Sequence, residues 1–220
     1  MNKIYIFALL LAVASANLAV DIGRISTSQD SFNCFAKLKF TRAIAIIADE
    51  QGTLYKNFRD NYNSAKAAGF ALFDARLLVN DTLIPEKFSA TITQALPPSF
   101  NGTVWLSVFD IANYWKKPVS QRIAYLESLI LAFKQHGVKV GIFSDYYWWK
   151  NVFGSRNAGS DILKAVPLCY SFDDVPLPSF NDWNKASFGT WDAPSMKNYE
   201  FSIDICSIRA NFFNYYETDN

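Results

Sequence analysis

Residues 104–115 read VWLSVFDIANYW, and this stretch decides how the rest of the chain is interpreted. Its first six residues form a short, mostly apolar run, which is typical of a strand buried on both faces. Side chains two positions apart on a strand point to the same face, so Ser107 and Phe109 are expected to share one. The more polar residues that follow indicate that this strand ends in a loop.

Comparable apolar runs recur along the chain, and AIAIIA at residues 43–48 is the clearest of them. The pattern predicts strands over residues 18–23, 43–48, 70–78, 104–109, 138–143, 167–172, 196–201 and 203–208. It predicts helices over residues 28–38, 54–68, 85–96, 120–136 and 146–153. Strands that alternate with helices predict a single-domain α/β fold, a TIM-like (β/α) barrel. The barrel should be irregular, because no helix fits between the last two strands.

The N-terminus, MNKIYIFALLLAVASA, combines one lysine, an apolar run and a small-x-small end. These features predict a secretory signal peptide over residues 1–16, and a mature domain over residues 17–220. The apolar run is too short to be a good membrane anchor. We therefore expect an extracellular protein, or one in the lumen of a secretory, lysosomal or phagosomal compartment, without a membrane partner after cleavage.

Charge and composition exclude several classes of function. Without Lys3 of the leader, 20 basic residues face 20 acidic ones, a balance that does not favour nucleic acid as a partner. The single histidine, His136, precedes a glycine expected to end a helix. One histidine and widely spaced cysteines predict neither a metal site nor a cofactor. The sequons at Asn80 and Asn101 are candidate glycosylation sites.

The three cysteines predict one disulfide and one free thiol in an oxidising compartment. Cys34 lies on the first predicted helix and Cys206 on the last predicted strand. These elements become neighbours if the strands close into a ring, so we predict a Cys34–Cys206 disulfide. Cys169 lies within an apolar strand and is expected to be inert packing.

Several motifs, taken in order, resemble those of the glycoside hydrolase family 25 lysozymes (the Chalaropsis type), especially their shorter protist and invertebrate branch. The motifs are AVDIG at residues 19–23, SFNCF around Cys34, GVKVGIFSDYYWW at 137–149, PLCYSFDD at 167–174 and GTWDAPSMKNYE at 189–200. The resemblance spans the mature chain and implies a lysozyme-like barrel that acts on peptidoglycan, with Asp21 as a retained family acid.

The departures from the family pattern fall on the catalytic positions. The family's strand usually reads W-L-D-I-E, and its Asp-x-Glu is here Ser107-x-Phe109. Its later Asp-x-Asn resembles Arg209-Ala-Asn211. A shifted register would recover Asp110 but would leave an alanine in place of the glutamate. We expect Ser107 and Phe109 to face the barrel mouth beside Asp21, with Arg209 close to that carboxylate.

Glycosidic bond cleavage needs an acid that protonates the leaving oxygen, and neither Ser107 nor Phe109 can supply one. Three readings follow. The first is a secreted, non-hydrolysing pseudoenzyme that binds a glycan (peptidoglycan-like or an N-acetylated oligosaccharide) or an extracellular protein. The second is an active muramidase with a relocated acid, for which Asp145, Asp173 and Asp174 are available after predicted strands. The third is a structural extracellular protein.

Ligand-binding residues are expected after the carboxyl ends of the strands, where barrels of this type place their sites. Aromatic side chains gather there, and sugars pack their apolar faces on such rings. The cluster comprises Tyr114, Trp115, Tyr146, Tyr147, Trp148, Trp149 and Trp191. The predicted ligand-binding set is Asp21, Tyr114, Trp115, Asp145, Trp149, Asp173 and Trp191.

Overall fold

The computed structural model describes residues 17–111, 114–172 and 178–216, and of these it leaves aside the side chains of residues 200–201 and 211–216. Eight strands close into a barrel in sequence order. They are β1 (Asn17–Asp21), β2 (Phe40–Ala48), β3 (Leu72–Leu78), β4 (Thr103–Ser107), β5 (Lys139–Ser144), β6 (Leu168–Ser171), β7 (Met196–Ile205) and β8 (Ile208–Tyr216). The strands β1 to β7 run parallel, and β8 runs antiparallel to both β7 and β1. The predicted irregular α/β barrel in one domain is therefore confirmed.

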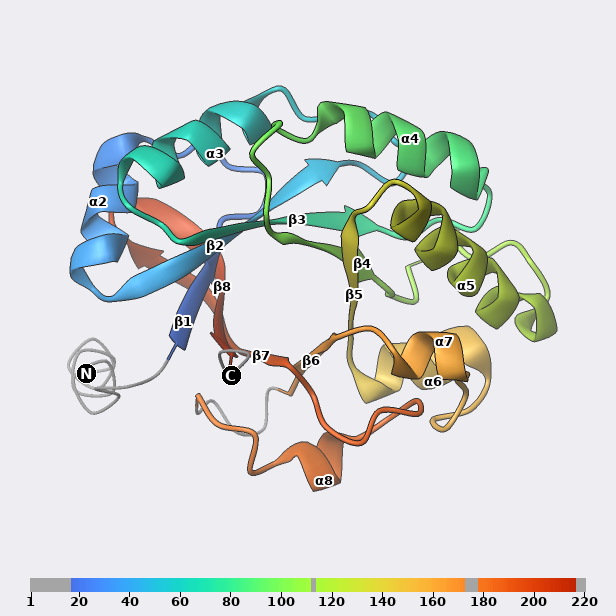
Figure 1. Cartoon of the computed structure of the whole chain (residues 1–220). Helices are drawn as coiled ribbons and strands as arrows, with labels where there is room; N and C mark the ends of the chain where they lie inside the picture. The colour runs from blue at the N-terminus through green and yellow to red at the C-terminus, as the bar shows by residue number, and fades with distance from the viewer. Residues whose placement is uncertain (1–16, 112–113, 173–177, 217–220) are drawn as a thin grey trace.

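Helices cover the outside of the sheet, as Figure 1 shows for α2 to α5. The helices are α2 (Gln29–Lys37), α3 (Asn57–Ala67), α4 (Pro85–Ala95), α5 (Val119–Gln135), α6 (Tyr146–Phe153), α7 (Asp161–Lys164) and α8 (Trp183–Ala186). The Ser28 side chain caps α2, since it accepts a hydrogen bond from the Ser31 amide. The helix predicted over residues 120–136 begins one residue earlier, because α5 starts at Val119 after Pro118. The short helices α7 and α8 were not predicted.

The prediction for the last two strands was wrong in its bounds. Residues 196–201 and 203–208 were expected to be separate strands, but they belong mostly to the single ten-residue strand β7. The chain turns at Cys206 and Ser207, both with positive φ, and returns as β8. As expected, no helix connects the last two strands, β7 and β8. They form a hairpin, which makes the barrel irregular.

The predicted disulfide is present and links α2 to the turn of this hairpin. Cys34 and Cys206 are bonded, with Cα atoms 5.6 Å apart, and they are separated by 172 positions in the sequence. The sequence pattern predicts Cys206 within the last strand. In the structure it lies in the turn between β7 and β8. Cys169 is a buried thiol outside the disulfide, and burial raises its pKa well above the ordinary value. A thiol with such a pKa stays protonated and unreactive, in agreement with a packing role.

Two groups of apolar side chains fill the molecule. The larger one lies between the sheet and the helices, and includes Val20, Leu106 and Ile142 on alternate strand positions. The smaller one fills the barrel and consists of Ala19, Ile44, Trp105, Phe143, Cys169 and Met196, with Phe109 packed against it. Strand alternation explains the division, because odd and even positions face opposite sides of the sheet. The smaller cluster thus identifies which strand positions face the barrel interior.

The predicted signal peptide, residues 1–16, lies outside the described residues. Among the helices of the described ranges, none has the length and apolar character needed to cross a membrane. The disulfide is consistent with an extracellular protein.

Candidate functional site

The barrel interior carries charged side chains above and beside its apolar cluster. Arg42 and Asp74 form a buried pair, with Arg42 Nε 2.7 Å from Asp74 Oδ2. The same carboxylate accepts hydrogen bonds from the Trp105 indole at 2.8 Å and from the Thr103 amide at 2.9 Å. Asp74 is therefore fully engaged in holding β2, β3 and β4 together and is not available for chemistry.

A second ion pair lies two positions further along β3, toward the carboxyl ends of the strands. Arg76 Nε is 2.9 Å from Asp21 Oδ2, and the Gly23 amide donates to Asp21 Oδ1 at 2.7 Å. Burial raises the pKa of the Asp21 carboxyl, and the Arg76 guanidinium limits the rise. The Arg76 guanidinium also lies over the Phe143 ring, 5.5 Å from its centre. The retained family acid is thus held by an arginine inside the barrel.

The expectation that Arg209 meets Asp21 was wrong. Arg209 is exposed on the β7–β8 hairpin, where it lies opposite Asp204, and Arg76 is the arginine that pairs with Asp21. The hairpin extends past Asp21, which is level with Phe212 on β8, and so carries Arg209 out into solvent. The sequence did contain a signal for Arg76: Asp74 and Arg76 are two charged residues on one face of an otherwise apolar strand.

The two positions that replace the family's acids lie at the carboxyl end of β4. Ser107 is 1% exposed, and its hydroxyl makes no hydrogen bond in the described structure. The half-buried Phe109 ring packs against the interior cluster, with its centre 5.4 Å from that of Phe143 and 5.7 Å from that of Trp148. Neither side chain can donate a proton to a leaving group. Asp110, the acid in the alternative register, is exposed.

One uncharged polar residue inside the barrel, Asn198, was not predicted. Asn198 lies two positions after Met196 on β7, and therefore shares the inward face of that strand. Its neighbours Lys197 and Tyr199 face the other way, toward Asp182 and the outer core. Asn198 is 1% exposed, yet neither the nitrogen nor the oxygen of its carboxamide has a hydrogen-bond partner in the described structure.

The three tryptophans proposed as ligand platforms are structural. The Trp149 side chain is 0% exposed, donates to the Ala158 carbonyl and packs against Phe153, Phe188 and Trp191. Trp115 donates to the Phe109 carbonyl from within the outer core, and Trp191 donates to the Val166 carbonyl. These predictions were wrong because indole rings are also the largest apolar side chains. Here they fill the core between α6 and the connection from β6 to β7.

Of the other predicted ligand-binding or catalytic residues, the structure describes Asp145 and Tyr114. Asp145 caps α6 by accepting a hydrogen bond from the Trp148 amide at 2.7 Å, which is the ordinary role for a loop aspartate. Tyr114 is half-buried, and burial together with the neighbouring Glu50 carboxylate raises its pKa. Asp173 and Asp174 lie outside the described residues, as does the Asn211 side chain.

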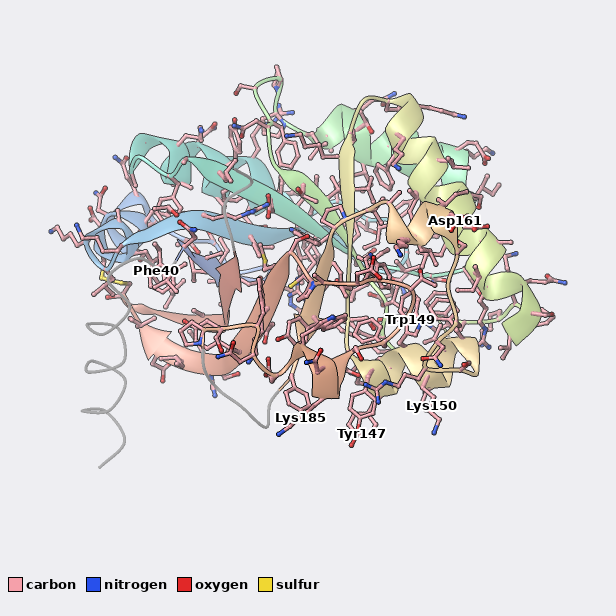
Figure 2. All side chains as sticks on the ribbon, turned by 60° about the horizontal axis from the view of Figure 1, so that its bottom comes forward. Phe40, Tyr147, Trp149, Lys150, Asp161 and Lys185 are labelled. Atoms are coloured by element: carbon pink, nitrogen blue, oxygen red, sulfur yellow. A yellow bond between two sulfur atoms is a disulfide. The ribbon has the colours of Figure 1, made fainter. Side chains whose placement is uncertain are left out.

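Two aromatic residues of α6 suit a ligand better than Trp149 does. Tyr147 is 65% exposed and projects from the surface in Figure 2, whereas Trp149 points into the molecule. Trp148 is half-buried and touches Phe109 at the barrel mouth. The helical spacing of the YYWW run could have separated these rings, since Trp149, Val152 and Phe153 form its buried face.

The two sequons differ in their surroundings, and we expect an N-glycan at Asn101 and none at Asn80. Asn101 is exposed, whereas the half-buried Asn80 amide donates to the Glu50 carbonyl at 3.0 Å and its oxygen accepts from Thr82. A sugar on Asn80 would disrupt this local network. Mass spectrometry of glycopeptides from secreted protein checks the assignment, and occupancy at Asn80 alone would contradict it.

Among the described residues, no group of three or more His, Cys, Asp or Glu side chains could hold a metal ion. What the described barrel mouth offers instead is an ion pair, a serine hydroxyl and a carboxamide, beside the half-buried rings of Phe109 and Trp148. This arrangement can bind a polar ligand by hydrogen bonds and ring contacts. In the described part of the mouth, Asp21 supplies a carboxylate, and that carboxylate is already paired with Arg76.

Comparison with known proteins gives a consistent result. The family model described as "Lysozyme-like protein 1" matches residues 12–199. The chain is 27% identical to "Probable GH family 25 lysozyme 5" of Dictyostelium discoideum over 99% of this chain and 98% of that protein. It is 32% identical to "Lysozyme-like protein 7" of Caenorhabditis elegans, over 49% of this chain and 38% of that protein.

Solved structures show the same fold at low sequence identity. A bacterial lysozyme from Streptomyces coelicolor has a TM-score of 0.71 and 12% identity, over 93% of this chain and 94% of that one. A modular autolysin of Streptococcus pneumoniae, in complex with a synthetic peptidoglycan ligand, has a TM-score of 0.62 and 15% identity. That match covers 92% of this chain and 47% of the autolysin.

Proposed function

Because the chain belongs to the lysozyme-like family of glycoside hydrolase family 25, we propose that it is a secreted glycan-binding protein that does not hydrolyse its ligand. The ligand class is a peptidoglycan-like or N-acetylated oligosaccharide. The binding site is the mouth of the barrel at the carboxyl ends of the strands, and the residues that contact the ligand are Ser107, Asn198 and Trp148.

The observation that carries this proposal is the pair of buried polar groups without partners. Leaving a buried donor or acceptor unpaired costs about 1–3 kcal/mol for each group. Ser107 and Asn198 leave a hydroxyl and both ends of a carboxamide unpaired on the inward face of the barrel. Sugars present hydroxyl and amide groups that complement these atoms, so a bound glycan would satisfy them.

The loss of hydrolysis follows from the same residues. A general acid must hold a proton within hydrogen-bond reach of the leaving oxygen. A serine hydroxyl does not release its proton near neutral pH, and the Phe109 ring has none to give. Asp21 is engaged by Arg76 and the Gly23 amide, which suits a role in positioning a ligand.

The aromatic rings at the mouth support a saccharide ligand. Phe109, Phe143 and Trp148 form a continuous edge-to-face series that reaches a half-buried ring at the rim. Rings of this kind pack against the apolar faces of sugars. A structural relative in complex with a synthetic peptidoglycan ligand supports the same class of ligand for this barrel.

A second candidate function is an active muramidase, favoured by the names of two Dictyostelium relatives, "Probable GH family 25 lysozyme 5" and "Probable GH family 25 lysozyme 2", which match over most of their length. Its acid would be Asp21, whose pKa burial raises, or Asp145, Asp173 or Asp174. A turnover assay separates the two functions, and its expected result is given in the Discussion.

Replacement of Asn198 by leucine tests the binding site. Asn198→Leu removes two unpaired buried atoms, so we expect it to raise the free energy of unfolding by about 1–3 kcal/mol. The same change should weaken binding of N-acetylglucosamine oligomers and peptidoglycan fragments at least tenfold. Urea unfolding and isothermal titration calorimetry measure the two effects. A gain in stability coupled to a loss of function is typical of binding sites.

Thr93→Val is the matched control. The Thr93 hydroxyl is also buried without a partner, but it lies on α4 outside the barrel. This variant should gain stability while binding the oligosaccharide as the unmodified protein does. Unchanged binding by the Asn198→Leu protein would contradict the proposed site, and absence of binding by the unmodified protein would contradict the proposed function.

A further inference from the structure

The opposite end of the barrel holds a cavity of about 1110 Å³ that the lysozyme-like function does not use. It opens at the amino ends of the strands, while Ser107 and Asp21 lie at the carboxyl ends. We call it the N-face cavity. Its lining includes Asn17 of β1, Arg42 of β2, Leu72 of β3, Thr103 of β4, Lys139 of β5 and Met196 of β7.

The described lining of the N-face cavity carries charge of one sign. Arg42, Lys134, Lys139 and Lys164 contribute to it, and no aspartate or glutamate does among the residues that the structure describes. Two of these cations form ion pairs, Arg42 with the buried Asp74 and Lys164 with the exposed Asp192. Lys134 and Lys139 are exposed and form no ion pair within the described residues. Since the chain has a formal net charge of only +1, this concentration of positive charge is local.

The floor of the cavity is rigid. The Trp105 indole and the Arg42 guanidinium both donate to Asp74, and the Thr103 amide donates to the same carboxylate. Gly141 is required for this arrangement, because a Cβ there would lie 2.4 Å from the Trp105 ring. A fixed floor lowers the entropic cost of ordering a site when a ligand binds.

We propose that the N-face cavity is a second binding site, which takes a ligand carrying phosphate groups. Lys134 and Lys139 bind the phosphate oxygens, and the cavity behind them accommodates the rest of the ligand above the Trp105 and Trp191 rings. Lysine binds phosphate as a point charge from a flexible stem, which suits exposed side chains at a rim. The ligand would be a soluble phosphorylated molecule or polymer, or the head group of an anionic lipid, since both present the same chemistry.

The test uses tripolyphosphate as the probe, at low ionic strength, and secreted mature protein from which N-glycans have been removed enzymatically, because Asn101 lines the cavity. We expect calorimetry to detect binding that weakens as salt is added, because exposed charges are screened. The double variant Lys134→Gln/Lys139→Gln should bind about tenfold more weakly, the loss expected for two ammonium–phosphate contacts near a protein surface. Trp105 and Trp191 provide a fluorescence signal for the same titration.

The control is the double variant Lys150→Gln/Lys185→Gln, which removes the same charge away from the N-face cavity. Both lysines are exposed, and both project from the surface in Figure 2. This control should bind tripolyphosphate as the unmodified protein does. Equal weakening by the two double variants, or no binding by the unmodified protein, would overturn the proposal.

Two further measurements define the site. Sedimentation with phosphatidylglycerol vesicles, with and without competing tripolyphosphate, separates the sources: competed sedimentation assigns a lipid head group, and no sedimentation assigns a soluble phosphate ligand. Oligosaccharide binding should be unchanged in the Lys134→Gln/Lys139→Gln protein, since its site lies at the other end of the barrel. The proposal therefore stands or falls independently of glycan binding.

Discussion

The mature protein is expected to leave peptidoglycan and N-acetylglucosamine oligomers intact. General acid catalysis alone supplies about 10²–10⁴-fold in rate, and here the partner of the acid is absent as well. Ser107 and Phe109 occupy the two positions, and Arg76 holds Asp21. Release of reducing ends, followed over a long incubation with an active muramidase as reference, should remain at the level of the blank.

The double variant Ser107→Asp/Phe109→Glu is expected to gain measurable turnover. A glutamate at position 109 would lie among the rings of Phe143 and Trp148, where an apolar environment raises the pKa of a carboxyl group. That direction suits a proton donor near neutral pH. Arg209 cannot lower this pKa from its exposed position on the hairpin.

The variant Ser107→Asp/Phe109→Gln is the control for this gain, because glutamine has the size of glutamate but no acidic proton. It should stay inactive. Turnover by the unmodified protein would contradict the prediction. If that turnover disappeared on Asp21→Asn, Asp145→Asn, Asp173→Asn or Asp174→Asn, the variant concerned would identify the relocated acid.

Loss of the Cys34–Cys206 disulfide is expected to lower the free energy of unfolding by about 3–5 kcal/mol. The bond joins residues 172 apart, so on the chain-entropy model it removes a large part of the freedom of the unfolded chain. The double variant Cys34→Ala/Cys206→Ala should unfold at a clearly lower urea concentration. Peptide mapping without reduction should recover the two cysteine peptides as one linked species.

A reductant provides the internal control. Dithiothreitol should destabilise the unmodified protein and have no effect on the Cys34→Ala/Cys206→Ala variant. Cys169→Ala keeps the disulfide and should retain the sensitivity to reductant. Coincident unfolding of the unmodified and double-variant proteins would refute the stabilising role of the bond.

Local sequence pattern was sufficient for the parallel part of the barrel. A continuous apolar run gave β2, and an apolar run interrupted only by Asp74 and Arg76 gave β3. Pro85 and the later Pro97 bounded α4 within about a residue. The β7–β8 hairpin was divided wrongly, because its turn is formed by Cys206 and Ser207, which adopt positive φ without glycine or asparagine. Turn chemistry of this kind leaves no signature in the sequence.

The site was predicted in part, because position along a strand can be inferred whereas pairing across a barrel cannot. The inward face of β4 followed from the spacing of Ser107 and Phe109. The partner of Asp21 depended on the register between β1, β2 and β3, which the sequence does not reveal. Asn198 was overlooked for a similar reason: an asparagine near a strand end resembles a loop residue until its neighbours are known.

The antiparallel strand β8 has a consequence for how the protein is made. It pairs with β1 over residues 17–21 and 212–216, so the first described strand is held by the last one. During synthesis β1 lacks this neighbour until residues 212–216 have left the ribosome. The barrel therefore cannot close before then, and the seven parallel strands must wait for β8, with β1 exposed at one edge of the sheet.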